Sequence, residues 1–598
     1  MSIVTRDCRH TQPQNRQKKE KHSLAKPELT YQKLRGGYYT PKPIADFLAR
    51  WAIRTPNAVV LEPSCGDGMM LESAIHALQD MGSGNIEHQV QGIEFDLNES
   101  QKSIERLSSL GIPTPSLMIH KGDFFAYCIA HLSEKRHFDS IIGNPPFIRY
   151  QNFPEEQRLP AFELMRRIGL KPTRLTNTWV PFIVASSLLL KPNGRLAMVV
   201  PAELLQVNYA AELRLFLSNY FQKITLVTFR QLVFEGIQQE VVLLLAELND
   251  GLSKGISTIE LDNANDLTQL IDIHDIETSA VKPLDHSKEK WTQYFLDAGE
   301  IELLREVRKN ASLKVSGDII DVDVGIVTGQ NSFFVLNNEQ IMENGLKKYS
   351  RKIVSRSGHL KGVVFSNEDW KTNDSENLAT HLLDFSGVGL ENIPADVLAY
   401  VNSGELANVN AGYKCSIRNP WYVVPSPWIP DAFMLRQIHT YPKIIVNSAN
   451  ATCTDTIHRV RLRNGLKKES VAAMFLNSVT FAFSEVTGRS YGGGVLELEP
   501  REAENLPVPY KGASDLDLNE IHELVLKNRI YDVLEITDRV LLHEQLGMSM
   551  KDVRSFRAIW EKLRDRRVNR KRAKTSTSPK IQTRLEGNSN PTVVRAEC

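Results

Sequence analysis

The chain has 598 residues, of which 42% are hydrophobic and 24% charged. This is enough apolar material for two or three globular domains, and it excludes a fibrous or wholly disordered protein. No apolar run approaches the length of a membrane span, and no hydrophobic region of a secretory signal follows the basic N-terminus. We therefore expect a soluble, cytoplasmic protein without membrane contact. The six scattered cysteines form no CxxC pair, which favours reduced thiols and predicts no metal site.

The net charge of +1 conceals an uneven distribution. Residues 1–36 hold nine Lys and Arg against three Asp and Glu, and residues 551–598 hold fourteen against five, so the body between them is acidic. Basic ends on an acidic body are compatible with electrostatic arms for a polyanion, and solvated tails give the same pattern. The last residues, 573–598, are rich in Ser, Thr, Asn and Pro, which predicts a disordered basic tail.

Short β-branched runs alternate with amphipathic stretches between residues 58 and 248, which predicts a doubly wound α/β sheet. The predicted strands are residues 58–62, 89–95, 117–120, 138–143, 195–200, 224–229 and 240–246. The loop between the last two is too short for a crossover helix, so we expect an antiparallel pair and a seven-stranded sheet whose last strand is reversed. Residues 250–295 are interpreted as a polar connection. A second, mixed α/β region is expected to begin after about residue 315.

The first predicted strand leads into a Gly-rich turn, Glu62-Pro63-Ser64-Cys65-Gly66-Asp67-Gly68. Glycine lets the backbone approach a ligand at the carboxyl edge of a sheet, although an ordinary turn between strand and helix has the same composition. The next two strands end at Glu94, which can accept both hydroxyls of a ribose, and at Asp123 beside Phe124, which suit the amino group and the flat face of an adenine. Acidic residues at three successive strand ends favour a single nucleotide-like site.

The fourth predicted strand ends in Asn144-Pro145-Pro146-Phe147, the sharpest motif of the chain. An exocyclic aromatic amine is a poor nucleophile, because its lone pair is delocalised into the ring. If the side-chain oxygen of Asn144 and the carbonyl of Pro145 each accept one N–H, the nitrogen can pyramidalise and direct its lone pair at a methyl group. The two prolines stiffen the turn, and Phe147 offers a face for stacking. An ordinary Asn-Pro turn is the alternative, and the position 21 residues after Asp123 argues against it.

In this order, the motifs resemble the gamma class of S-adenosylmethionine-dependent DNA adenine-N6 methyltransferases, the TaqI-like modification methylases. The resemblance includes Tyr38-Tyr39-Thr40-Pro41 and a predicted helix over residues 44–52, which precede the Gly-rich turn as they do in that class. It implies a Rossmann-like class I methyltransferase sheet, S-adenosylmethionine as the cofactor, Asn144 and Pro145 as the acceptors and Phe147 as the base stacker. The residues placed around the cofactor are Thr40, Glu62, Pro63, Ser64, Cys65, Gly66, Glu94, Asp123, Phe124 and Pro146. Cys65 stands where many methyltransferases carry glycine or another small residue.

A second aromatic side chain is expected to cover the other face of an extruded base. Residues 231–237 lie in the loop before the reversed strand, where this class carries such a residue, and Phe234 is the candidate. A core aromatic residue at the end of a strand is the alternative. Taking a base out of the stack costs about a few kcal/mol, which stacking between two aromatic faces helps to offset.

The C-terminal half is similar, in less specific segments, to the DNA-recognition domain of the same family. These segments are residues 324–334, 421–422, 441–445, 492–498 and 506–509. The predicted organisation is a basic arm (1–36), a methyltransferase domain (37–250), a connector (251–315), a DNA target-recognition domain (316–510), a helical segment (511–572) and the tail (573–598).

Together these features predict a monomeric, site-specific methyltransferase that clamps double-stranded DNA and methylates N6 of adenine by base flipping, as part of a restriction-modification system. Only about 36 residues precede the first motif, so the cognate restriction endonuclease is expected on a separate chain. Structured RNA and the glutamine amide of a protein share the same nitrogen chemistry, but the long recognition half argues against both. A catalytically idle DNA-binding protein is the alternative from another class. Adenine rather than cytosine N4 is inferred from Asn144, where cytosine enzymes of this type carry Ser.

Overall fold

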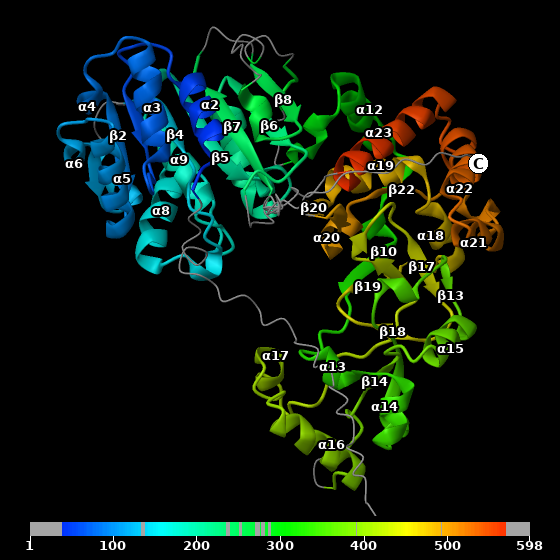
Figure 1. Ribbon diagram of the computed structural model, residues 1–598. Coiled ribbons are helices and arrows are strands. Elements are labelled where there is room, and N and C mark those ends of the chain that lie inside the picture. Colours follow the sequence, from blue (N-terminus) through cyan, green and yellow to red (C-terminus); the bar gives the residue numbers. More distant parts are fainter. Residues whose placement is uncertain are drawn as a thin grey trace, which may run out of the picture.

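The computed structural model describes residues 39–132, 138–234, 240–249, 254–268, 276, 281–284, 289–389, 392–463, 465–491 and 493–569. The expected basic arm, the basic tail, Tyr38 and Gly492 lie outside these residues. Figure 1 shows an N-terminal α/β half, coloured blue to green, beside a C-terminal half, coloured green to red, that contains several smaller sheets.

The N-terminal half is built on one eight-stranded sheet in the order β3-β2-β1-β4-β5-β7-β6-β8. Its strands are β1 (Val60–Glu62), β2 (Val90–Glu94), β3 (Ile119–Lys121), β4 (Phe138–Gly143), β5 (Leu190–Pro201), β6 (Lys223–Phe229), β7 (Val241–Glu247) and β8 (Gly255–Leu261). Strand β7 runs antiparallel to β5 and β6, and the remaining pairs are parallel. The predicted α/β class is therefore confirmed. The reversed strand, β7, lies between β5 and β6.

The eighth strand corrects the expected seven. Residues 250–295 were expected to form only a polar connection, yet β8 pairs in parallel with the whole of β6. The last four residues of this edge strand are partly exposed, so they do not have to be large and apolar. One of its polar side chains is buried and satisfied, because the hydroxyls of Ser257 and Thr225 lie 2.9 Å apart. Because several of its residues are short and polar, this strand lacks the apolar pattern on which the strand prediction was based.

Helices cover both faces of the sheet, as expected for a doubly wound fold. They include α2 (Lys42–Ala52), α3 (Met69–Asp80), α5 (Leu97–Ser109), α7 (Phe124–His131), α8 (Glu155–Arg167), α9 (Trp179–Leu188) and α10 (Ala211–Tyr220). Neighbouring strand residues face opposite sides: Val60 belongs to the cluster beneath α2 and α3, and Leu61 belongs to the cluster beneath α7 to α10. The predicted helix over residues 44–52 is the main part of α2.

The C-terminal half consists of four small sheets and their covering helices. The sheet orders are β10-β19-β15-β17-β13, β11-β14-β12-β18, β16-β21-β20 and β22-β9. The strands are β9 (Leu313–Val315), β10 (Ile320–Val324), β11 (Val335–Leu336), β12 (Ser350–Val354), β13 (Val364–Phe365), β14 (His381–Leu383), β15 (Ala432–Leu435), β16 (Gln437–Ile438), β17 (Ile444–Asn447), β18 (Thr452–Cys453), β19 (Ile457–Leu462), β20 (Arg489–Tyr491), β21 (Val495–Glu497) and β22 (Pro507–Pro509). The longer helices are α12 (Ala298–Arg308), α15 (Asn367–Ser375), α16 (Ala395–Leu406), α19 (Ser478–Thr487), α21 (Leu518–Leu526), α22 (Ile530–Thr537) and α23 (Met550–Val568).

One hydrophobic cluster runs through both halves, from α9 and α10 to α19 and α23. Polar contacts reinforce the junction: the amide of Gln206 exchanges two hydrogen bonds with the backbone of Ser490, at 2.8 and 2.7 Å. The last helix is held by a buried ion pair in which Arg567, 2% exposed, donates to both carboxylate oxygens of Glu485, at 3.0 and 2.6 Å. The C-terminal helix is thus part of the core that joins the two halves.

The cysteines that the structure describes, Cys65, Cys128, Cys415 and Cys453, are buried free thiols. Within the described ranges, no helix combines the length and the apolar character that crossing a bilayer requires.

Replacing Arg567 with Met should lower the free energy of unfolding by about 3–5 kcal/mol, because it leaves the buried Glu485 carboxylate without its partner. The matched control is Arg539→Met, whose ion pair with Glu544 spans 3.9 Å and is exposed on both sides; its loss should cost less than about 1 kcal/mol. Urea unfolding followed by tryptophan fluorescence compares the two. Equal midpoints for the two variants would show that the buried pair does not hold α23.

Candidate functional site

A cavity of about 400 Å³ lies at the carboxyl ends of β1 to β4, within the range of about 300–1,000 Å³ typical of small-molecule sites. It is lined by Tyr39, Pro63, Ser64, Gly66, Glu94, Phe95, Asp96, Glu99, Gly122, Asp123, Phe124, Asn144, Pro146, Ile148, Asn152, Pro154, Gln157, Thr178 and Phe182. The structure therefore brings eight of the predicted site residues to one cavity: Pro63, Ser64, Gly66, Glu94, Asp123, Phe124, Asn144 and Pro146.

The Gly-rich turn forms one wall of the cavity. Its backbone is tied to β2, because the N–H of Cys65 donates to the carbonyl of Ile93 at 2.9 Å. Gly66 and Gly68 adopt positive φ values of 53° and 83°, a region that side chains with a Cβ rarely enter. A Cβ at Gly68 would also lie 3.1 Å from the backbone of Ser103. Glycine is thus required for both the turn and its packing against α5.

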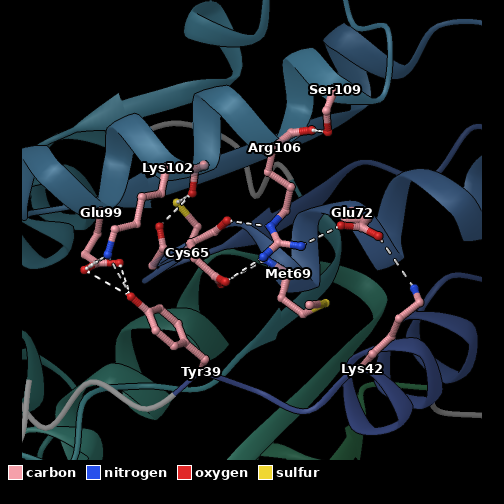
Figure 2. A network of polar contacts seen from close by, with 12 residues as sticks. Tyr39, Lys42, Cys65, Met69, Glu72, Glu99, Lys102, Arg106 and Ser109 are labelled. Atoms are coloured by element: carbon pink, nitrogen blue, oxygen red, sulfur yellow. Dashed lines mark hydrogen bonds and ion pairs between the residues drawn. The ribbon is translucent and has the colours of Figure 1, made fainter.

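Helix α5 clamps this turn from outside through a network of polar contacts (Figure 2). Arg106 donates to the carbonyl of Asp67 at 2.8 Å, to its carboxylate at 2.6 Å and to Glu72 at 2.8 Å. The hydroxyl of Ser103 donates to the carbonyl of Gly66 at 2.7 Å. One face of α5 therefore holds the Gly66-Asp67 part of the turn.

Among the described lining residues, all the charged ones are carboxylates, namely Glu94, Asp96, Glu99 and Asp123. Glu94 accepts from the N–H of Gly66 at 2.8 Å and from the N–H of Asp96 at 2.9 Å, one bond to each oxygen. Because a carboxylate oxygen can accept more than one hydrogen bond, both remain able to accept a hydroxyl. The acidic lining suits a ligand that carries hydroxyls and net positive charge. Among the described residues, no group of three or more His, Cys, Asp or Glu side chains is arranged to hold a metal ion.

Asp123 caps the start of α7 by accepting from the N–H of Ala126 at 2.8 Å. Burial raises the pKa of its carboxyl, while the backbone donors lower it. The next residue, Phe124, is stacked with Phe182 at a centroid distance of 5.2 Å, and both rings line the cavity. A carboxyl group beside a flat apolar wall matches the edge and face of a planar base.

Glu62 lies behind the cavity lining at the end of β1 and is 3% exposed. Burial raises the pKa of its carboxyl well above the usual range, and the charges of Asp67 and Glu94 raise it further. Its Oε2 has no hydrogen-bond partner among the described residues. A buried, unpaired carboxyl oxygen at this place is compatible with a polar ligand group nearby.

The turn after β4 is held on both sides. The amide nitrogen of Asn144 donates to the hydroxyl of Thr40 at 3.2 Å, and its backbone carbonyl accepts from Ser64 at 3.4 Å. Downstream, the carbonyl of Ile148 accepts from Thr178 at 3.2 Å. Pro145 is buried, and Phe147 is partly buried and packs against both main hydrophobic clusters. The backbone of the turn is therefore well anchored. Of the two predicted acceptors, Asn144 lines the cavity, whereas Pro145 is not one of its described lining residues.

Cys65 and Phe234, two of the predicted site residues, are not among the residues that line the cavity. The side chain of Cys65 is buried, and its Sγ lies 3.6 Å from the hydroxyl of Ser103, so the thiol points into α5 and not into the cavity. Burial raises the pKa of this thiol well above its usual value. Phe234 is 6% exposed and belongs to the core cluster under α2 and α3. In this structure Phe234 therefore lies where a core aromatic residue would lie. This is the alternative to a base-stacking role that the sequence left open.

Sequence reasoning missed the residues that α5, α8 and α9 contribute. Glu99, Ser103 and Arg106 follow one another at helical spacing, so a polar stripe on the helix after β2 was the available signal. Thr178 and Phe182 lie at the start of α9, far from any motif, and only the fold brings them to the cavity.

Two family models match the chain. Residues 73–234 match "Eco57I restriction-modification methylase", and residues 288–542 match "Type II methyltransferase M.Eco57I, C-terminal domain". The chain has both domains of the Eco57I-like restriction-modification methylases. This methylase is 22% identical to Type II methyltransferase M.AccI of Acinetobacter calcoaceticus over 86% of the chain and 94% of that protein. It is 23% identical to M.XamI of Xanthomonas campestris pv. amaranthicola over 79% of the chain and 85% of that protein.

Among solved structures, the Type IIL restriction-modification enzyme MmeI, determined in complex with DNA, superposes with a TM-score of 0.55. The match covers 88% of this methylase and 75% of the MmeI chain at 12% sequence identity, so it shows a shared fold.

Replacing Arg106 with Ala should weaken the binding of S-adenosylmethionine, the expected cofactor, by about tenfold, because Asp67 of the Gly-rich turn loses two charge-assisted contacts and Glu72 of the following helix loses one. The control is Glu105→Ala on the exposed side of the same helix, where the side chain bonds only to Gln101 among the contacts described. Titration calorimetry on both variants provides the measurement. If Arg106→Ala binds the cofactor as the control does, the clamp has no role in shaping the site.

Proposed function

We propose that the protein transfers a methyl group from S-adenosylmethionine to N6 of adenine within a short sequence of double-stranded DNA, after extruding the base from the helix. The observation that carries this proposal is the position of the Asn144 turn, which lines the same acid-rich cavity as Glu94 and Asp123. The two methylase domain matches support DNA as the substrate.

The cavity provides the groups that S-adenosylmethionine needs. In the proposal, Glu94 accepts the ribose hydroxyls and Asp123 accepts the adenine amino group beside Phe124. All three residues line the cavity, which supports these roles. The acidic lining complements the ammonium and sulfonium charges. When bound, the cofactor supplies the methyl group. The residues of the chain orient it and exclude water.

Asn144 and Pro145 are the proposed catalytic acceptors. The side-chain oxygen of Asn144 and the backbone carbonyl of Pro145 each take one N–H of the target amine, so the nitrogen lone pair is freed from the ring and turned toward the cavity. These hydrogen bonds strengthen as the nitrogen becomes positive, and they therefore favour the transition state over bound substrate. No side chain of the turn acts as a base in this scheme: the amine nitrogen gains the methyl group and then loses one N–H proton, which passes to bulk water as the product leaves.

Phe147 is the proposed stacking face for the extruded base, and its ring lies between the two main clusters. For Phe234 to cover the other face, it would have to leave the core position that it occupies in this structure. The expected recognition domain, residues 316–510, is proposed to read the sequence through base edges in the major groove.

The proposed setting is a restriction-modification system whose nuclease is a separate polypeptide. The match over 94% of M.AccI, a protein described as a Type II methyltransferase, supports the restriction-modification setting. Methylation-sensitive sequencing of DNA from cells that express the protein tests the proposal and distinguishes adenine N6 from cytosine N4. DNA without new methylation at any defined sequence would refute it.

Replacing Asn144 with Ala should abolish methyl transfer and leave cofactor affinity within about tenfold, because the acceptor acts mainly in the transition state. Transfer of tritiated methyl to duplex DNA and calorimetry with the cofactor measure the two effects. More than a tenth of wild-type turnover in the variant would exclude Asn144 from catalysis.

Replacing Phe147 or Phe234 with Ala separates a stacking role from a core role. Loss of a stacking face should cost about 1–3 kcal/mol of binding to duplex DNA and should brighten 2-aminopurine placed at the target position. We expect this for Phe147→Ala. For Phe234→Ala, unchanged emission with a melting temperature lower by several degrees would assign the residue to the core, and brighter emission with unchanged melting would assign it to the base.

A further inference from the structure

The segment Tyr39-Thr40-Pro41 connects two walls of the site, helix α5 and the turn after β4, with helix α2. Tyr39 lines the cavity, and its hydroxyl donates to Glu99 of α5 at 3.1 Å. Thr40 is 7% exposed and accepts from the side-chain amide of Asn144 at 3.2 Å. Pro41 precedes α2, and its carbonyl accepts from the N–H of Ile44 at 3.0 Å. Three consecutive residues therefore join α5, the catalytic turn and α2.

The contact between Thr40 and Asn144 fixes the orientation of the Asn144 side-chain amide. An asparagine side chain has an acceptor end and a donor end, and only the acceptor end can receive an N–H of the target amine. The bond from Nδ2 to the hydroxyl of Thr40 holds the amide plane and directs Oδ1 to the opposite side. A freely rotating amide would present its donor end to the target for part of the time, and the two N–H groups would then face each other.

Thr40 is itself held firmly, so it can serve as a fixed point. Its neighbour Tyr39 is tied to α5 by Glu99 and by Lys102, whose Nζ donates to the Tyr39 hydroxyl and to Glu99, each at 2.9 Å (Figure 2). Glu99 is buried, and helix α2 anchors the other side through buried apolar residues. Small displacements of a group that orients a reacting atom reduce rates strongly, so this anchoring has a use in catalysis.

We propose that Thr40 is a positioning residue that sets the side-chain amide of Asn144 with its oxygen toward the target amine, and that the Tyr39 contacts with α5 hold Thr40 in place. The proposal rests on the proposed methyl transfer to an exocyclic amine. It adds to that function a residue that acts through Asn144, separate from the contact with the cofactor that the resemblance implies for Thr40.

The test compares Thr40→Val, which keeps the shape and removes the hydroxyl, with Thr40→Ser, which keeps the hydroxyl. At saturating S-adenosylmethionine and DNA, Thr40→Val should lower kcat about tenfold or more, the loss expected for one hydrogen bond that matters in the transition state. Cofactor affinity measured by calorimetry should stay within about threefold, and so should the KM for DNA. Thr40→Ser should restore kcat to within about threefold of the wild type.

A second pair of variants separates the effect of Thr40 on the orientation of the Asn144 amide from its effect on packing. In an Asn144→Asp variant the carboxylate has two equivalent acceptor oxygens and no donor end, so adding Thr40→Val should cost less than about threefold. The proposal is overturned if Thr40→Val keeps wild-type kcat, if Thr40→Ser is as impaired as Thr40→Val, or if the loss appears only as weaker cofactor binding. Wild-type protein that methylates no exocyclic amine in DNA would instead refute the proposed function, an outcome that the wild-type assay reports without any variant.

Discussion

The parallel arrangement of β3, β2, β1 and β4 determines where the polar groups that follow these strands lie in the cavity. In this order, Glu94 pairs with Lys121 at the ends of β2 and β3, and Glu62 at the end of β1 pairs with Gly92, two residues before the end of β2. Strand β4 continues the edge on the other side of β1. Parallel strands end at the same edge, so short loops after each strand meet above the sheet. The acidic residues, the Gly-rich turn and the Asn144 turn are neighbours for this reason alone, although up to 82 residues of chain separate them.

What the sequence could predict depends on local signals. Strand β4 has the predicted bounds because it is an apolar run that ends at a Gly-Asn-Pro turn, and both features lie within ten residues. The cavity follows from the same reasoning: once four successive strands are taken as parallel, their terminal residues must converge. Eight residues named from motifs line the cavity on that basis.

The features that the sequence did not reveal have a different cause, since each depends on a partner far away in the chain. Strand β8 is defined by its pairing with β6 and not by its own composition. The thiol of Cys65 turns inward because Ser103 and Gly92 leave room for it there. Arg106 is an ordinary basic residue on a helix until the turn of Asp67 is folded beside it. Phe234 lies in the loop where the resembling class carries a stacking aromatic residue. Its burial under α2 and α3 depends on contacts made by the whole sheet.

The shared core described above bears on how such enzymes could exchange their sequence preference. Helix α23 packs on α19 and pairs Arg566 with Glu260 of β8 at 2.7 Å, while Gln206 bonds to Ser490 across the junction. A chimaera that grafts only residues 316–510 from a relative would bring a foreign α19 and a foreign β20 against native partners. For the recognition role proposed for this half, the exchangeable unit is therefore the C-terminal half together with the residues of β8 that α23 contacts, and changes confined to loops of the native half disturb the junction less than a transplant does.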